Sequence, residues 1–251
     1  MVHFNNENDI NVKPLVSIIT VVYNGVKTLE KTIQSVLNQT FQNIEYIIVD
    51  GNSKDGTIDI IRKYEKQISY WISEPDNGIY DAMNKGIKLA HGQYIVMLNS
   101  GDTYDSIAIE KAAEEMKKNK FSVDVYYGMM RIMSENNKIL WIYGYTHNFL
   151  SSTMIAHPTC LVKKQVYEQF QYDENYKSAA DYDFFLRLNK NGFSFNFLEI
   201  IFGNYLLGGM SDSYLGYKET LKIKYKYGLI SWKSFFFHKI LGYLKWCLNG
   251  K

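Results

Sequence analysis

LVSIITVVY (15–23) is a continuous run of β-branched and apolar residues, which is the composition of a strand buried on both faces of a sheet. The next segment, VKTLEKTIQSVLNQT (26–40), has apolar residues that recur at helical spacing. IEYIIVD (44–50) is a second buried strand, and it stops at Gly51. A strand, a helix and a strand joined by short connections predict a parallel sheet covered by helices.

The alternation continues further along the chain. Helices are expected over 57–64 and 79–91, and strands over 70–73 and 93–99. The second half is less regular, with predicted helices over 107–118 and 181–192 and predicted strands over 123–133, 141–145 and 193–207.

The predicted fold class is therefore α/β, with a mostly parallel sheet flanked by helices. We expect one domain over 1–213, made of a Rossmann-like nucleotide-binding half (14–105) and an α+β acceptor half (106–213). A basic, aromatic helical tail (214–251) follows it.

The composition excludes several classes of protein. With 46% hydrophobic and 22% charged residues, the 251-residue chain is neither disordered nor fibrous. Lys and Arg total 28 against 26 acidic residues, which argues against a nucleic-acid-binding protein. Cys160 and Cys247 are too far apart in sequence for a zinc ribbon, a CxxC redox site or a disulfide scaffold. Because MVHFNNENDINVK (1–13) has no apolar signal-peptide core, we expect a cytoplasmic protein.

Charge is distributed unevenly. The tail carries eight Lys and one Glu, a local charge of +7, against −5 for the rest of the chain. Within it, SWKSFFFHKILGYLKWCLNG (231–250) has a wide apolar arc interrupted by lysines. That pattern favours a helix lying on an anionic membrane surface. The alternative is a C-terminal helix that packs on the core or on a second copy of the chain, as a homodimer.

The first strand-to-helix turn, YNGVKTLE (23–30), contains one glycine. It is therefore neither a dinucleotide-binding G-x-G-x-x-G turn nor a Walker A loop, which argues against hydride transfer and P-loop ATP hydrolysis. The strand ends instead offer carboxylates and amides. These suit a nucleotide held through its base and ribose, with a cation on its phosphates.

Three aspartates are candidates for chemistry. Asp50 ends a buried strand, where it could accept hydrogen bonds from a uridine-type nucleoside or cap its own turn. Asp102, in LNSGD (98–102), could ligate Mg²⁺ or Mn²⁺ or cap the helix that begins near Ile107. Asp181 is placed at a helix start, where it could act as a general base or cap the helix.

Asp183 is expected to differ from Asp181. Two positions apart on a helix, their side chains point about 200° apart, so they should not share a site. Asp183 lies four residues before Arg187, and we expect a solvated ion pair between them.

Four segments together resemble the family 2 glycosyltransferases with the GT-A fold, in the branch that makes bacterial surface polysaccharides. They occur in the family's order and spacing and cover residues 14–188: PLVSIITVVYNG, IEYIIVDGNSKDGT, EPDNGIYDAMNKGIKLAHGQYIVMLNSGD and AADYDFFLRL. The resemblance implies an inverting transferase that uses a nucleotide sugar, most often a UDP-sugar, and a divalent metal, Mn²⁺ or Mg²⁺. The acceptor would be a saccharide or a lipid-linked saccharide.

The resemblance also implies roles for individual residues. Tyr23 and Asn24 would line the nucleotide pocket, and Asp50 and Ser53 would contact the nucleoside. Asp181 would be the base. The remaining implied positions are the metal motif, Asn99 and Asp102, the third motif, Asn84 and Lys85, and His157 near the acceptor cleft. A lone His beside Pro is more often a packed structural residue, so that reading of His157 stays open.

The chain departs from the family pattern at several positions. Asp102 is the only carboxylate of the metal motif, since Asn99 and Gly101 occupy the positions where the family has an acid. Met83 stands where the family has Arg, and Lys85 is the candidate for the missing phosphate charge. Ala180 stands where the family has Glu before the base. GGMSDS (208–213) resembles a loop that closes over bound donor.

We therefore expect an inverting glycosyltransferase of bacterial polysaccharide biosynthesis, in the cytoplasm or at the inner face of the plasma membrane. The alternative is a non-catalytic nucleotide-sugar-binding or scaffold protein. A nucleotidyltransferase is a third hypothesis. Such an enzyme normally has a basic phosphate-binding loop near the first turn, and the turn YNGVKTLE is not such a loop.

Overall fold

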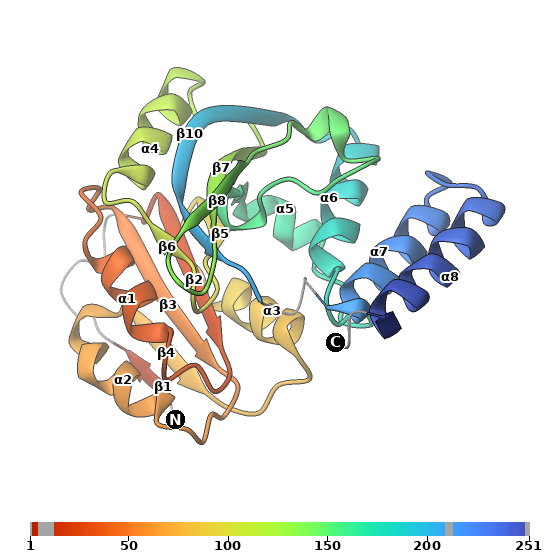
Figure 1. Ribbon diagram of the computed structural model, residues 1–251. Coiled ribbons are helices and arrows are strands. Elements are labelled where there is room, and N and C mark those ends of the chain that lie inside the picture. The colour runs from red at the N-terminus through yellow and green to blue at the C-terminus, as the bar shows by residue number, and fades with distance from the viewer. Residues whose placement is uncertain (1, 5–12, 209–212, 249–251) are drawn as a thin grey trace.

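The computed structural model describes residues 2–4, 13–208 and 213–248. Within these residues the chain forms one ten-stranded mixed sheet with helices on both faces (Figure 1). The strands are β1 (Val2–Phe4), β2 (Val16–Val22), β3 (Ile44–Asp50), β4 (Tyr70–Ser73), β5 (Tyr94–Met97), β6 (Thr103–Tyr104), β7 (Val125–Met133), β8 (Ile139–Tyr143), β9 (Leu161–Lys163) and β10 (Phe195–Leu206). The α-helices are α1 (Leu29–Leu37), α2 (Thr57–Tyr64), α3 (Ile79–Leu89), α4 (Ala108–Lys118), α5 (Lys164–Gln169), α6 (Ala180–Lys190), α7 (Tyr214–Lys226) and α8 (Trp232–Leu248).

The strand order is β1-β4-β3-β2-β5-β9-β7-β10-β6, and β8 pairs with β7. The four central strands of the first half, β4-β3-β2-β5, are parallel. Beyond them the sheet is mixed, because β9 runs antiparallel to both β5 and β7, whereas β7 and β10 are parallel. The predicted α/β fold, with a parallel half and an irregular second half, is confirmed.

The alternation of side chains along the strands builds two separate cores. In β2, Val16, Ile18 and Val22 face one core, which also contains residues of α1, α2 and α4. Ile19 and Val21 face the other, with residues of α3, α5 and α6. All seven residues of β2 are buried, as its continuous apolar sequence predicts.

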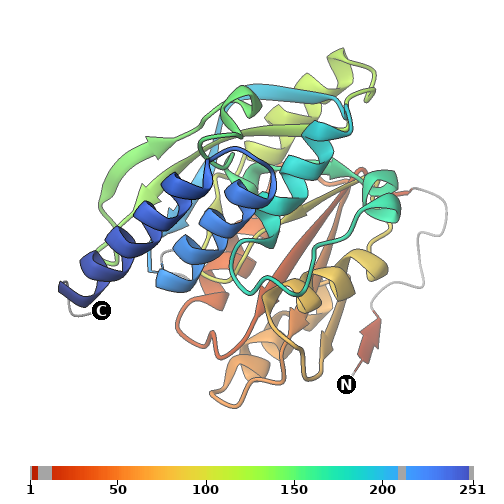
Figure 2. The same ribbon diagram turned by 90° about the vertical axis from the view of Figure 1, so that its right-hand side faces the viewer.

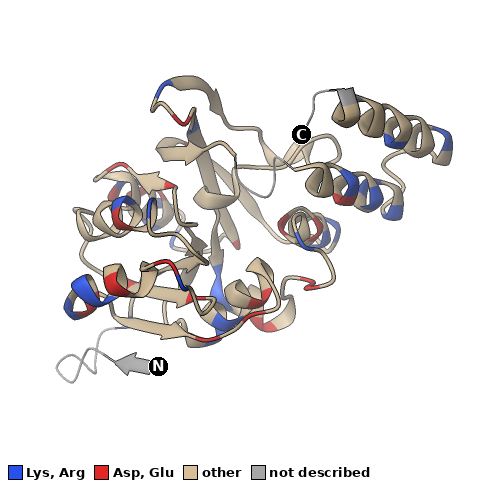
Figure 3. Cartoon of the chain, turned by 60° about the horizontal axis from the view of Figure 1, so that its bottom comes forward, with Lys and Arg blue, Asp and Glu red and all other residues tan. Residues whose placement is uncertain are grey.

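The tail forms a hairpin of two helices, α7 and α8, which lies at one side of the molecule (Figure 2). Leu221 and Ile223 of α7 are buried, and Ile223 belongs to the core beneath α3 and α6. Helix α8 packs on α7, where Tyr217 Oη donates to the carbonyl of His238, and otherwise exposes most of its apolar side chains. Lysines are distributed along both helices (Figure 3). None of the described helices is long and apolar enough to cross a membrane.

The predicted donor loop 208–213 lies largely outside the described residues, because positions 209–212 are not among them. Residues 1 and 5–12 also lie outside the described residues.

The packing of α3 against the sheet generates a testable prediction. Ala in place of Gly in a helix normally stabilises the helix by about 1 kcal/mol. At Gly86, however, a Cβ would lie 2.5 Å from Ile19 Cγ2 of β2. Gly86→Ala should therefore lower the free energy of unfolding by about 1–3 kcal/mol, measured by urea denaturation. Lys88→Ala, at an exposed position of the same helix, is the control and should change it by less than about 0.5 kcal/mol. A stabilised Gly86→Ala would contradict the close helix–sheet contact.

Candidate active site

A cavity of about 710 Å³ opens between the parallel half of the sheet and the second half. Such a volume is typical of small-molecule sites. Tyr23 and Asn24 line it from the turn after β2, and Asn99 and Asp102 line it from the turn after β5. Asp181, at the start of α6, lies on the opposite wall. Residues distant in sequence therefore meet at the carboxyl ends of the parallel strands, where ligands bind in open α/β sheets.

A hydrogen-bonded cluster lies at the ends of β2 and β3. Asp50 pairs in register with Val22 and is fully buried. Its Oδ2 accepts from the backbone N–H of Ser53 (3.0 Å) and from Ser73 Oγ (2.7 Å). Ser53 Oγ in turn accepts from the backbone N–H of Asn24 (2.7 Å), which holds a left-handed conformation (φ 51°). Asp50 therefore does cap its turn, as one of the two interpretations proposed.

The second carboxylate oxygen of Asp50 differs from the first. Asp50 Oδ1 is buried and has no hydrogen-bond partner among the described residues. A buried acceptor without a donor is energetically costly, so it is a candidate for a ligand contact. Asp50 and Ser53 do not line the cavity themselves; they lie behind Tyr23 and Asn24, which do.

Asp102 is not a helix cap. Helix α4 begins at Ala108, and its cap residue, Ile107, has no side-chain cap hydrogen bond. Asp102 is instead buried, and its Oδ1 accepts from the backbone N–H of Leu206 (3.1 Å) at the end of β10. Burial raises the pKa of Asp102 to about 7, and the Leu206 hydrogen bond opposes that rise.

The neighbourhood of Asp102 offers hard oxygen donors. Asn99 lines the cavity, and its Oδ1 is buried and has no hydrogen-bond partner among the described residues. Those residues contain no group of three His, Cys, Asp or Glu side chains that could hold a metal ion. One carboxylate and one amide oxygen still suit Mn²⁺ or Mg²⁺, which usually take their remaining ligands from water and substrate phosphates.

Asp181 is a partly exposed carboxylate held in a fixed position. Its Oδ1 accepts from Tyr80 Oη (3.0 Å), and its Oδ2 lies 3.7 Å from His157 Nδ1. The side chain keeps 21% of its accessible surface, on the wall of the cavity. A carboxylate with one oxygen fixed and the other facing a cavity can accept a proton from a bound hydroxyl.

His157 is both packed and adjacent to the site. Its ring lies edge-on to Tyr172 and Phe185, and its Nε2 lies 2.9 Å from Tyr172 Oη. Burial lowers the pKa of His157, although the Asp181 charge opposes this shift. The imidazole is therefore neutral near pH 7. His157 is packed, as the structural interpretation predicts, and it also lines the cavity, so its place near the acceptor stays a prediction.

Asn84 and Lys85 do not face the cavity. Asn84 is buried, and its Nδ2 donates to the carbonyl of Tyr172 and to Glu174 Oε1. Lys85 Nζ contacts the Pro75 carbonyl at 2.8 Å, Glu74 at 3.0 Å and Asp81 at 3.3 Å. The structure thus separates these two residues from the other predicted site residues, because the helical turn directs their side chains away from the cavity.

The expectation of a solvated Asp183–Arg187 pair is wrong. The pair exists, with Arg187 Nε 2.8 Å from Asp183 Oδ2, but Asp183 is 1% exposed. Its Oδ1 accepts from Lys226 Nζ and Tyr227 Oη, both at 3.0 Å. Helix α7 covers the pair, and the local sequence around Asp183 carries no trace of that contact. The predicted separation of Asp183 from Asp181 is observed.

Sequence reasoning missed several residues that line the cavity. Tyr80, Asp76 and Lys177 are polar, and Trp141 and Tyr143 of β8 are aromatic. The glycine at position 51 is the sequence signal for Asp76, because a Cβ on Gly51 would lie 2.4 Å from Asp76 Oδ2. Such a close approach is one reason for a glycine directly after a strand.

Comparisons with known proteins identify the family of the chain. The family model described as glycosyl transferase family 2 matches residues 17–174. The chain is 34% identical to the putative teichuronic acid biosynthesis glycosyltransferase TuaG of Bacillus subtilis, over 73% of this chain and 75% of TuaG. It is 31% identical to the chondroitin synthase of Escherichia coli, over 80% of this chain but only 30% of the synthase.

Two solved structures share the fold. The chain superposes on TarS of S. aureus in complex with UDP-GlcNAc with a TM-score of 0.68 at 18% identity, covering 83% of this chain and 65% of TarS. For the mannosyltransferase PcManGT from Pyrobaculum calidifontis, in complex with GDP-Man and Mn²⁺, the TM-score is 0.65 at 14% identity. That match covers 91% of this chain and 68% of PcManGT.

The fold is that of the GT-A glycosyltransferases. The chain belongs to glycosyl transferase family 2, as its four motifs suggested. It is accordingly a transferase that depends on a nucleotide sugar.

The raised pKa of Asp102 predicts how pH affects the metal-free, nucleotide-free protein. Between the unfolded value of 3.8 and the folded value of about 7, the folded state binds more protons than the unfolded state. Its stability should therefore fall as pH rises through this window. Asp102→Asn removes this dependence and should become stabilising relative to the parent above pH 7, by at most about 4 kcal/mol.

Urea denaturation of both proteins at pH 4.5 and pH 8 measures this difference. The two should differ least at pH 4.5. An equal difference in unfolding free energy at the two pH values would show that Asp102 titrates normally.

Proposed function

We propose that the protein transfers a sugar from a UDP-sugar to a hydroxyl of a saccharide or lipid-linked saccharide acceptor, with inversion, in bacterial polysaccharide biosynthesis. The observation that carries this proposal is the position of Asp181. Its carboxylate faces a cavity whose other wall is formed by the nucleotide-side residues Tyr23, Asn24 and Asn99. TarS, which shares the fold, was solved with UDP and with UDP-GlcNAc.

The nucleoside would bind at the ends of β2 and β3. Asp50 Oδ1, the unpartnered oxygen, would accept from the imide N–H of uracil or from a ribose hydroxyl after a small displacement of the residues that cover it. Tyr23, which is 66% exposed at the rim, offers an aromatic face to the base. Asn24 is already fixed by hydrogen bonds to the Ser53 and Lys54 region, so this side of the site is organised before the donor arrives.

Asp181 would act as the base. The acceptor hydroxyl attacks the anomeric carbon while its proton passes to Asp181 Oδ2, and the bond from that carbon to the nucleoside diphosphate breaks. General-base help of this kind contributes about 10²–10⁴-fold. A single displacement with the base on the side opposite the leaving group inverts the anomeric centre. Tyr80 holds the other oxygen, Oδ1, and so orients the carboxylate.

A divalent cation would be held by Asp102 and Asn99 together with the donor phosphates. The unpartnered Asn99 Oδ1 and the buried carboxylate next to it fit a hard cation. When bound, it would stabilise the negative charge on the departing diphosphate. PcManGT, a mannosyltransferase of the same fold, was solved with Mn²⁺.

The tail would hold the enzyme at the cytoplasmic face of the membrane. Helix α8 exposes large apolar side chains, including Phe237 at 60% and Ile240 at 59% exposed, and it contains Lys233, Lys239 and Lys245 but no acidic residue. Apolar area combined with lysines matches an anionic lipid surface. A lipid-linked acceptor would be found there.

The proposed base is tested by Asp181→Asn. The amide keeps the size of the side chain but cannot take a proton, so transfer should fall by about 10²–10⁴-fold. UDP binding in the presence of Mn²⁺, measured by calorimetry, should change by less than about twofold, since no role in donor binding is proposed for Asp181. Asp59→Asn, at an exposed position of α2, is the control for the same chemical change and should retain transfer. Turnover by Asp181→Asn within threefold of the parent would remove Asp181 from the base role.

The membrane proposal is tested by sedimentation with lipid vesicles. The full-length protein should sediment with vesicles containing anionic phosphatidylglycerol and not with neutral phosphatidylcholine vesicles. Lys233→Glu combined with Lys239→Glu should weaken binding by at least about tenfold, since each lysine contributes about 1 kcal/mol.

The control for charge is Lys111→Glu combined with Lys117→Glu on α4, which packs on the other core. It should sediment like the parent. Failure of the parent to bind anionic vesicles, together with a dimer in solution, would assign the exposed face of α8 to a second copy of the chain.

A further inference from the structure

Helix α6 begins without a cap of its own. Its cap residue is Ala179, which has no side-chain oxygen, whereas Ser, Thr, Asp and Asn are the usual residues there. The N–H groups at this point are bonded by a residue of another helix. Glu219 of α7 accepts from the backbone N–H of Lys177 at 2.9 Å, of Ser178 at 2.8 Å and of Ala179 at 3.1 Å.

Glu219 is suited to hold this turn rigidly. Its side chain is almost completely buried, at 6% exposed, and three N–H donors converge on one ionisable group. Hydrogen bonds to a charged acceptor are shorter and stronger than neutral ones. A carboxylate at a helix N-terminus also interacts favourably with the helix dipole.

The turn that Glu219 holds is part of the active site. Lys177 and Ser178 line the cavity, and Asp181 follows Ala179 by two residues. A rotation or shift of the turn would therefore move the carboxylate of Asp181 relative to Tyr80. Asp181 lies in the first turn of α6, so its position depends on where the helix begins.

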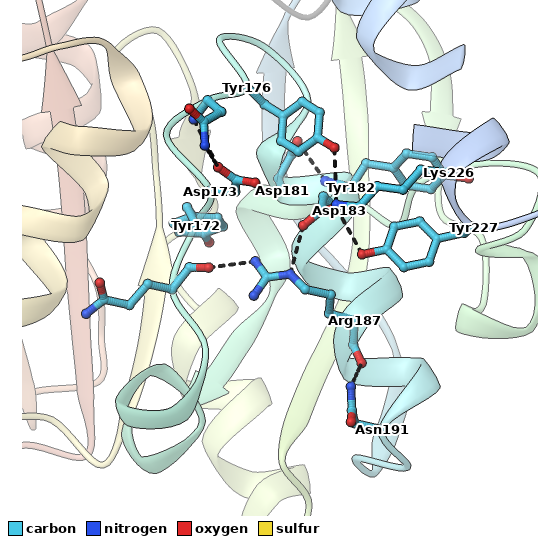
Figure 4. A network of polar contacts seen from close by, with 12 residues as sticks. Tyr172, Asp173, Tyr176, Asp181, Tyr182, Asp183, Arg187, Asn191, Lys226 and Tyr227 are labelled. Atoms are coloured by element: carbon cyan, nitrogen blue, oxygen red, sulfur yellow. Dashed lines mark hydrogen bonds and ion pairs between the residues drawn. The ribbon is translucent and has the colours of Figure 1, made fainter. Parts of the chain in front are cut away.

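Helix α7 is itself fixed to α6 at a second point. Asp183 bonds Arg187 of its own helix, and it also accepts from Lys226 and Tyr227 at the end of α7 (Figure 4). Glu219 is thus carried by a helix that is anchored independently of it. Neither α7 nor α6 lies within residues 17–174, the part of the chain that matches the family model.

We propose that Glu219 is a positioning residue for sugar transfer: from α7 it fixes the turn 177–179 and thereby places the carboxylate of Asp181 in the cavity. This inference rests on the proposed role of Asp181 as the base. It assigns to the tail, which the sequence sets apart as a separate segment, a direct part in organising the catalytic centre.

The test is Glu219→Gln in the full-length protein. The amide keeps the volume of the side chain but can accept through one oxygen only. Glu219 accepts from Lys177 through both oxygens and from Ser178 and Ala179 through Oε2, so the NH₂ group of Gln would face at least one backbone N–H donor. We expect kcat to fall by about 10- to 100-fold, the effect of displacing a catalytic group by about 1 Å. The affinity for UDP with Mn²⁺ should stay within about twofold of the parent, because the nucleotide-side residues lie on the other wall.

Amide hydrogen exchange gives a readout that does not depend on activity. The N–H groups of the turn 177–179 should exchange faster in Glu219→Gln than in the parent, while those of β2 and β3 should not change. Lys226→Met is the matched control, because it removes one of the two bonds that join the end of α7 to Asp183 without touching the turn. It should leave kcat within about threefold of the parent.

Two results would overturn the proposal. One is a kcat for Glu219→Gln within threefold of the parent despite faster exchange in the turn 177–179. The other is an equal loss of kcat in Lys226→Met, which would show that α7 matters only for general stability. If Glu219→Gln does not fold, Glu219→Asp, which keeps the charge but is one methylene shorter, is held to the same two criteria. An active Asp181→Asn variant would contradict the assignment of Asp181 as the base. The hydrogen-exchange result does not depend on that assignment, so the two failures can be told apart.

Discussion

The short strand β9 is the constraint on which the site depends. It pairs with β5 on one side and with β7 on the other, both antiparallel, and so joins the parallel half and the mixed half into one sheet. The cavity is lined from both halves, with Asn24 and Asn99 on one side and Asp181 on the other. The β5–β9–β7 connection therefore fixes the donor side relative to the proposed base, together with side-chain contacts such as that of Tyr80 with Asp181.

Buried carboxylates are the second organising feature, and each is satisfied differently. Asp183 is neutralised by two cations and a tyrosine, and Glu219 is bonded by three backbone N–H groups. Asp50 keeps one oxygen unpartnered, and Asp102 has a raised pKa with one backbone hydrogen bond. The fully satisfied pair supports the structure at α6 and α7, whereas the two incompletely satisfied carboxylates lie on the donor side of the site. Incomplete satisfaction of a buried charge is costly, which is why it points to ligands.

Some groups that the family's motifs would supply come from other positions in this chain. The family resemblance predicts an acid at position 99 or 101 and at position 180, where this chain has Asn99, Gly101 and Ala180. In the folded chain a carboxylate reaches the start of α6 from α7 through Glu219, and Asn99, which lines the cavity, keeps an unpartnered oxygen. The depleted motifs therefore do not by themselves favour the hypothesis of a non-catalytic scaffold.

The sequence by itself determined the α/β class, the parallel first half and the strand-end positions of Asp50 and Asp102, because buried strands and amphipathic helices leave periodic patterns in the chain. Through linked motifs it also singled out Asp181, which lines the cavity. Only the tertiary structure decided that Asn84 and Lys85 face away from the cavity, that the Asp183 pair is buried, that Tyr80 and Asp76 line the cavity, and that Glu219 bonds the turn before α6. The reason is physical: these facts depend on contacts between residues up to about a hundred positions apart, such as Tyr80 with Asp181, and local periodicity carries no information about which distant segments meet.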